Sequence, residues 1–187
     1  MLKYKILLAS KSPRRKELLE SLGYTFKTIS IDCDEVFPAG LPVNQIAGYL
    51  SELKANAYPD LKKDEVLITA DTIVAIDDEF LGKPKDEAEA WEMLRKLSDK
   101  THEVYTGITI KTLDSEVTRT DVAHVRFSDF TDEEIKYYTE NFKPFDKAGS
   151  YGIQEWIGMA KVQHITGSFY TIMGLPTHMV YDELNKL

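Results

Sequence analysis

The sequence predicts an α/β protein in which a mixed, twisted β-sheet is flanked by helices. Three observations support this fold class. Apolar runs rich in β-branched residues occur between stretches whose apolar residues repeat at helical spacing. The most apolar run, 66–76, is typical of a central strand that is buried on both faces. An alternating segment over 104–110 and a second one that ends near Phe127 flank a polar turn, which predicts a hairpin and therefore some antiparallel pairing.

The length and the composition favour one globular domain. The chain has 187 residues, of which 43% are hydrophobic and 29% charged, and we expect residues 1–187 to form a single domain of one or two lobes. The net charge of −8 disfavours binding to nucleic acid and to anionic membranes. No stretch approaches the ~20 apolar residues of a membrane span.

The cysteine content and the first residues of the chain favour a cytoplasmic location. Cys33 is the single cysteine, so no internal disulfide is possible, as expected in a reducing compartment. The apolar run that follows the first residues is too short for the hydrophobic region of a signal peptide. We therefore expect a cytoplasmic protein with no membrane partner.

Local signals place the elements in the first part of the chain. Ser12 occupies the N-cap position of a helix and Pro13 its first position, where the missing N–H costs nothing. Gly23 supplies the stop of this helix. The expected elements up to residue 76 are a strand at 6–9, a helix from 13 to 23, a strand at 27–31, a helix with its apolar stripe over 43–57, and the strand at 66–76.

Capping residues mark two helices in the second part of the chain. Asp86 and Glu89 form a capping pair for a helix that runs to Leu97. Thr131 and Glu134 form a capping box at the start of another helix. The other expected elements are a turn at 77–78 into a short strand at 80–81, the hairpin, a loop over 144–152, two short strands that flank Gly167-Ser168, and a last helix after Pro176.

A cluster of cations lies at the start of the first helix. Lys11, Arg14, Arg15 and Lys16 crowd the end at which the helix dipole is already positive, and cations are disfavoured there. The free N–H groups of a helix N-terminus bind anions, so the cluster favours a bound phosphate. The alternative is a solvated basic turn.

Asp71 is unusual because it lies in the middle of the most apolar run. An ionised carboxylate is costly in a buried strand unless it is paired with a cation or bound to a metal ion. Such a carboxylate is a candidate general base, and the alternative is a strand end or a bulge at which it accepts local N–H groups. Glu35 could supply a second oxygen to a metal. Lys54, on the apolar stripe of its helix, either extends to solvent or points its ammonium at a partner.

The inventory of polar residues fits a polyphosphate site. Arg14, Arg15, Lys54 and Lys83 adjoin apolar elements and could hold phosphate charge, while isolated acids could hold a metal and activate a water. No dinucleotide-binding G-x-G-x-x-G, Walker A loop or G-x-S-x-G elbow is present. The histidines lack the spacing of metal ligands. These residues predict an enzyme that handles nucleotides or phosphates.

Several short motifs resemble those of one family in the same order along nearly the whole chain. Ser10-Lys11-Ser12-Pro13-Arg14-Arg15 resembles the S-x-S-P-R-R motif of the Maf-like nucleoside triphosphate pyrophosphatases. The further matches are Asp34-Glu35, Lys54-Ala55, Ala70-Asp71-Thr72, Gly82-Lys83-Pro84, Asp146-Lys147-Ala148-Gly149, Tyr151-Gly152-Ile153-Gln154, Gly167-Ser168 and Gly174-Leu175-Pro176.

This resemblance implies a fold, a reaction and a set of site residues. The fold would be related to inosine triphosphate pyrophosphatases, with a cleft between two lobes. The reaction would be metal-assisted hydrolysis of a nucleoside triphosphate to the monophosphate and pyrophosphate. The implied roles are Asp71 as proton acceptor, Ser10, Arg15, Lys54 and Lys83 for substrate binding, Glu35 and Asp71 for a divalent metal (Mg²⁺, Mn²⁺ or Co²⁺), and Arg14, Thr72 and Gln154 for specificity.

Arg14, Thr72 and Gln154 resemble the specificity residues of the family branch that acts on dTTP and UTP. The pairing edge of uracil and thymine presents carbonyl oxygens beside an N–H. The Gln154 amide can donate to such a carbonyl and accept from the N–H. The chain departs from the common pattern at Glu155-Trp156, where many members have glycines, and at Thr171, where asparagine is common. The first departure could reshape the base pocket.

Three further expectations accompany the resemblance. The family implies a homodimer, and Tyr137, Tyr138 and Phe142 fit either an interface or the core. A different function remains open: a nucleotide-binding regulatory protein linked to cell division or septum formation, with little turnover. A house-cleaning hydrolase for modified pyrimidine nucleotides is a third reading.

Overall fold

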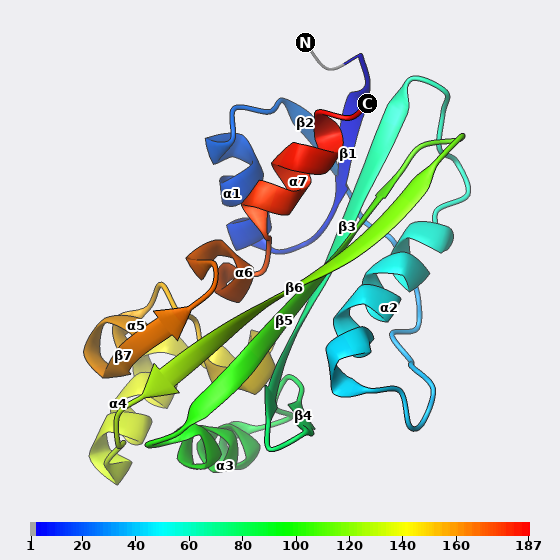
Figure 1. Cartoon of the computed structure of the whole chain (residues 1–187). Helices are drawn as coiled ribbons and strands as arrows, with labels where there is room; N and C mark the ends of the chain where they lie inside the picture. Colours follow the sequence, from blue (N-terminus) through cyan, green and yellow to red (C-terminus); the bar gives the residue numbers. More distant parts are fainter. Residues whose placement is uncertain (1–2) are drawn as a thin grey trace. The chain divides into compact units, whose positions relative to one another are not determined.

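The computed structural model describes residues 3–187 and contains a mixed sheet with helices beside it (Figure 1). Within these residues the sheet has seven strands in the order β2-β1-β3-β5-β6-β7, with β4 paired to β3. The strands are β1 (Lys5–Ala9), β2 (Phe26–Ile29), β3 (Glu65–Ile76), β4 (Glu79–Leu81), β5 (Thr101–Lys111), β6 (Glu116–Phe127) and β7 (Val162–Thr166).

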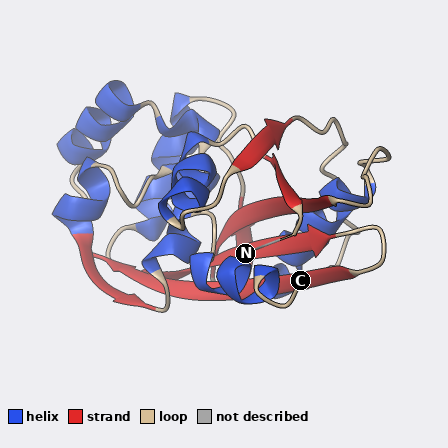
Figure 2. Ribbon diagram, turned by 90° about the horizontal axis from the view of Figure 1, so that it is seen from above, coloured by secondary structure: helices blue, strands red, loops and turns tan. Residues whose placement is uncertain are grey.

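The helices are interspersed with the strands along the chain, and Figure 2 separates the two classes by colour. The α-helices are α1 (Pro13–Ser21), α2 (Val43–Asn56), α3 (Glu87–Leu97), α4 (Asp132–Phe142), α5 (Trp156–Lys161), α6 (Phe169–Met173) and α7 (Thr177–Leu184). Two short 3₁₀ turns are η1 (Pro144–Asp146) and η2 (Ala148–Ser150). Among residues 3–187, no helix is long and apolar enough to cross a membrane.

Strand pairing confirms the predicted mixed sheet. β1 is parallel to both β2 and β3, whereas β3 with β4 and β6 with β7 are antiparallel. In the register of β1 and β3, Ala9 lies opposite Thr69. The chain therefore leaves β1 at Ser10 beside the point where β3 continues into Ala70 and Asp71. This register determines which side chains meet at the carboxyl end of β1.

The chain divides into two compact units. Unit 1 comprises Met1–Asp71, Thr106–Asp121 and Gly174–Leu187, and unit 2 comprises Thr72–Tyr105 and Val122–Met173. In unit 1, α1 and α7 lie on one side of the strands and α2 on the other (Figure 1). Part of the unit 1 core is formed by Leu7, Leu67 and Ala55, which join β1 and β3 to α2.

Most sequence-predicted elements are confirmed, and one is wrong. The segment after Ser168, expected as a short strand, is the helix α6. The helix α5 was not predicted. Each of these helices is shorter than two turns, so its apolar residues show no period that separates helix from strand. Tyr138 is a fully buried core residue, whereas Tyr137 is exposed, so only the latter of these two could contact another chain.

A buried aromatic cluster in unit 2 surrounds His102. The imidazole is almost completely buried, its Nε2 is 2.7 Å from the Tyr151 hydroxyl, and its ring packs against Phe127 at a centroid distance of 5.0 Å. Within the described residues, Nδ1 has no hydrogen-bond partner. Burial lowers the pKa of His102 from 6.5 to about 3, so the ring is neutral at neutral pH.

His102 should make the folded protein sensitive to acid. In the unfolded chain the imidazole binds a proton as pH falls through 6.5, whereas the folded protein excludes that proton until pH about 3. The free energy of unfolding therefore decreases as the pH decreases through this window. Between pH 7 and pH 5, His102 accounts for about 2 kcal/mol of the decrease. Urea unfolding at both pH values should show that His102→Gln loses less stability than the wild type by about this amount. The exposed His178→Gln is the control, and equal losses in all three proteins would contradict the assignment.

Candidate active site

The first helix begins at the carboxyl end of β1, where the sequence placed its basic cluster. Ser12 is the N-cap residue and Pro13 the first helical residue, as predicted. The Ser12 side chain makes no capping hydrogen bond. The backbone N–H of Ser12 donates to Ser10 Oγ at 3.1 Å. No acidic side chain occupies the first turn, so Arg14 and Arg15 leave this end of the helix positive.

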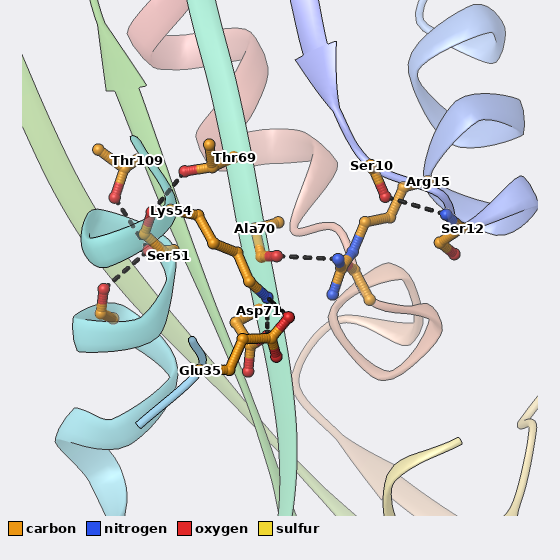
Figure 3. Close-up of polar contacts among 12 residues, drawn as sticks. Ser10, Ser12, Arg15, Glu35, Ser51, Lys54, Thr69, Ala70, Asp71 and Thr109 are labelled. Carbon is orange, nitrogen blue, oxygen red and sulfur yellow. Dashed lines mark hydrogen bonds and ion pairs between the residues drawn. The ribbon is translucent and has the colours of Figure 1, made fainter. Parts of the chain in front are cut away.

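Arg15 connects α1 to two other segments of unit 1. Its Nε donates to the carbonyl of Gly174 at 2.7 Å, and its Nη1 donates to the carbonyl of Ala70 at 2.8 Å (Figure 3). Burial lowers the pKa of Arg15 below its usual range, and the nearby Asp71 carboxylate opposes this change. The guanidinium is thus held in a fixed position next to the residue that precedes Asp71.

Asp71 is buried in β3 and is paired with a cation. A carboxylate within so apolar a strand was expected to need such a partner. The residue is 9% exposed, and its Oδ1 lies 2.5 Å from the ammonium of Lys54. The same ammonium lies 3.2 Å from Glu35 Oε1. Lys54 therefore points inward and joins two carboxylates (Figure 3). The ion pair removes the alternative in which Asp71 only satisfies backbone groups of a bulge.

Buried hydroxyl groups fix α2, which carries Lys54, against β3 and β5. Thr69 Oγ1 donates to the carbonyl of Ser51 at 2.6 Å, and Ser51 Oγ lies 2.9 Å from Thr109 Oγ1. Thr69 is two residues before Asp71, and Ser51 is one helical turn before Lys54. These contacts therefore set the position of the ammonium relative to the carboxylate. Sequence reasoning missed them, although Ser51 shares the helix face of Lys54.

Two glycines permit the close approach of α2 to the strands. A Cβ on Gly107 of β5 would lie 2.3 Å from the backbone carbonyl atoms of Ala47. A Cβ on Gly48 would lie 2.6 Å from the Thr120 hydroxyl. The first contact is with backbone and the second with a side chain that can rotate, so Gly107 is the stricter requirement.

Unit 1 therefore brings together five of the sequence-predicted site residues. Around the carboxyl end of β1 and the middle of β3 lie Ser10, Arg15, Lys54, Glu35 and Asp71, and the half-buried Arg14 follows in the first turn of α1. The Lys54 ammonium and the Arg15 guanidinium lie near two carboxylates here, an arrangement that can hold a polyanion and accept a proton.

Three predicted residues belong to unit 2. Thr72 follows Asp71 directly in β3 and is half-buried. Lys83 is exposed, and the carbonyl of the preceding Gly82 accepts the N–H of Gly149 at 3.0 Å, which anchors the segment. Gln154 is exposed after the buried Ile153.

The carboxylates of unit 1 fit a divalent cation that keeps other ligands. Across residues 3–187, no group of three or more His, Cys, Asp or Glu side chains could hold a metal by itself. Glu35 and Asp71, however, already converge on one positive charge. Mg²⁺ is commonly bound by one or two carboxylates together with water and substrate phosphates, so this pair suffices for such a site.

Comparison with known proteins identifies the family. The family model described as "Maf-like protein" matches residues 5–187. The chain belongs to the Maf-like family. A relative of this Maf-like protein from Bacteroides thetaiotaomicron is 50% identical over 99% of the chain and 97% of the relative. Relatives from Flavobacterium johnsoniae (46%, covering 99% and 96%) and Porphyromonas gingivalis (48%, covering 97% and 94%) are similar, and all three carry the name dTTP/UTP pyrophosphatase.

A solved structure also resembles part of this Maf-like protein. It is titled "Structure of a HAM1 protein from Coxiella burnetii". The sequence identity is 16%, the TM-score is 0.44, and the match covers 66% of this chain and 73% of that one.

Gly107→Ala should separate α2 from the sheet. The new methyl group would overlap the backbone of Ala47, so we expect the free energy of unfolding to fall by about 3 kcal/mol, at the upper end for overpacking. Gly48→Ala is the matched control, because Thr120 can rotate away, and its loss should be about 1 kcal/mol or less. Urea unfolding measures both, and equal losses would show that backbone contact does not determine the packing of α2.

Proposed function

We propose that this Maf-like protein is a nucleoside triphosphate pyrophosphatase that hydrolyses dTTP and UTP to the monophosphate and pyrophosphate. The observation that carries the proposal is the buried Asp71, whose carboxylate shares the Lys54 ammonium with Glu35. Asp71 directly follows Ala70, whose carbonyl accepts a hydrogen bond from Arg15 of α1. The name shared by relatives that are 46–50% identical in sequence to this chain supports the choice of substrates. The family match over 5–187 supports treating the chain as one functional domain.

Hydrolysis needs a base next to a site that holds phosphate charge. In the proposed reaction a water oxygen bonds to phosphorus, the P–O bond between the α- and β-phosphates breaks, and pyrophosphate leaves. Asp71 accepts the proton that the water loses. Lys54 compensates the charge of Asp71 in its buried strand until the substrate is bound.

Phosphate binding is assigned to the cations and to the start of α1. Arg15 is preorganised by its two carbonyl contacts, so it loses little entropy when it binds a phosphate. The first N–H groups of α1, together with Ser10, add donors at the same end of β1. Lys83 is proposed as a further phosphate ligand.

A divalent metal ion would be held by Glu35 and Asp71. When bound, it would neutralise phosphate charge and orient the triphosphate. Carboxylate oxygens accept Mg²⁺, Mn²⁺ and Co²⁺ alike, so the ligands do not select one of these ions.

Base selection is assigned to Arg14, Thr72 and Gln154. The Gln154 amide can donate to a uracil or thymine carbonyl and accept from the ring N–H, which a glutamate could not do. The two bases share this edge, so the methyl group that distinguishes them should change binding by no more than about 1–3 kcal/mol. The proposal includes a cytoplasmic location, in agreement with the single cysteine.

Asp71→Asn tests the base. An amide cannot accept the proton, so kcat for pyrophosphate release from UTP should fall by about 10²–10⁴-fold while the unfolding curve keeps its midpoint within a few tenths of a molar urea. Asp121→Asn is the control, since it changes a half-buried strand aspartate elsewhere in unit 1. Near-normal turnover by Asp71→Asn would refute the mechanism. A wild-type protein that binds UTP but releases no pyrophosphate would instead be the regulatory protein considered above.

Glu35→Gln tests the metal ligand. One of two carboxylates becomes a neutral amide, so the Mg²⁺ concentration that gives half-maximal activity should rise by about 10-fold or more. Glu52→Gln, an exposed change of equal charge on α2, should leave this concentration unchanged. Activity that persists in the wild type after treatment with a chelator would remove the metal from the proposal.

A further inference from the structure

The segment that carries Gln154 is a tight turn. The Glu155 N–H donates to the carbonyl of Gly152 at 3.0 Å, which closes a four-residue turn. Tyr151, Gly152 and Ile153 are buried, and Gln154 is the exposed residue of the turn. Its backbone is therefore fixed on one side by the interior of unit 2.

The carboxylate of Glu155 is engaged at both oxygens. Oε2 accepts a hydrogen bond from the Tyr138 hydroxyl, and Oε1 lies 3.2 Å from the ammonium of Lys147. Lys147 is buried and has a second partner in Asp146 at 2.8 Å. Glu155, a residue that departs from the common family pattern, thus directs its charge into the protein rather than toward a ligand.

Tyr138 connects the two ends of the turn. Its hydroxyl donates to Glu155 and accepts the N–H of Gly152 at 2.9 Å. Burial, with a contribution from the bond to Glu155, raises the pKa of Tyr138, so the hydroxyl stays protonated and remains a donor. The ring is fixed in α4 by stacking on Phe142 at 5.2 Å. One rigid side chain therefore holds both Gly152 and Glu155.

The Gln154 amide lies near the same carboxylate. A Cβ built on Gly152 would lie 2.8 Å from Glu155 Cδ, 3.0 Å from Glu155 Oε1 and 3.0 Å from Gln154 Nε2. The amide nitrogen of Gln154 and the carboxylate of Glu155 therefore lie on either side of the same small space, which the missing Cβ of Gly152 leaves open. A negative carboxylate favours the NH₂ end of an amide over its carbonyl end, so Glu155 gives the two flip states of the Gln154 amide different energies.

We propose that Glu155, held by Tyr138 and Lys147, is a positioning residue that fixes the orientation of the Gln154 amide and thereby sets the preference for uracil over cytosine. The inference rests on the proposed function. Uracil presents a carbonyl and an N–H where cytosine presents an NH₂ and a bare ring nitrogen, so the two bases require opposite orientations of one amide. An amide free to flip would accept both bases, whereas a fixed amide accepts one.

The test compares kcat/KM for UTP and CTP in variants of these residues. Tyr138→Phe keeps the ring and removes the hydroxyl, and Glu155→Gln keeps the shape and removes the charge while Lys147 retains Asp146 as a partner. We expect each variant to lower the UTP-to-CTP ratio at least about 5-fold, mainly through KM, which corresponds to about 1 kcal/mol between the two orientations of the amide. The matched control is Tyr105→Phe, which removes a hydroxyl that donates to Glu103 in the same unit. Its ratio should stay within about 2-fold of the wild type.

A double-mutant cycle separates positioning from general destabilisation. Gln154→Ala should lower the ratio by itself, and adding Glu155→Gln to it should cause no further fall, because the carboxylate acts through the amide. An unchanged ratio in Glu155→Gln and Tyr138→Phe, or an equal fall with and without Gln154, would overturn the inference alone. A wild-type protein that releases no pyrophosphate from UTP would overturn the proposed function and the inference with it.

Discussion

A carboxylate inside a buried strand must be compensated, and in unit 1 the compensating charge comes from a different element. Asp71 belongs to β3 and Lys54 to α2, so the pair exists only if the helix lies close to the strands. The bare backbone of Gly107 permits this approach, and the buried hydroxyls of Ser51 and Thr69 fix its register. The packing of α2 is therefore part of the proposed chemistry, since a helix that lay away from β3 would leave the carboxylate without its cation.

A related device occurs in unit 2, where a charge orders a backbone turn. Glu155 is held by a tyrosine and a lysine, and Gln154 next to it is left exposed. In unit 1 the buried ionic contact joins groups that are themselves proposed to act on the substrate or the metal, whereas in unit 2 it orders the residue next to such a group. Binding of an ordered group loses less conformational entropy, and this favours selectivity as well as rate.

Much of the fold followed from local patterns. The strand at 66–76, the N-cap residues Asp86 and Thr131 and the proline at the start of α1 are short-range signals, and each was confirmed within a few residues. The elements near the C-terminus were predicted less well, because α5 and α6 are too short to show a helical period. Their helical form depends on packing that local propensity does not encode.

The sequence by itself determined which features are proposed to carry the chemistry: a basic helix start, an acid within an apolar strand, and an amide suited to pyrimidines. It could not determine how these side chains are held, because hydrogen bonds between residues far apart in the chain depend on the tertiary arrangement. Lys54 fitted solvent or a partner equally well on pattern alone, and the structure places its ammonium between Glu35 and Asp71. Glu155, which as a sequence feature suggested an altered base pocket, is turned inward by Tyr138 and Lys147, whose nearness only the folded chain produces.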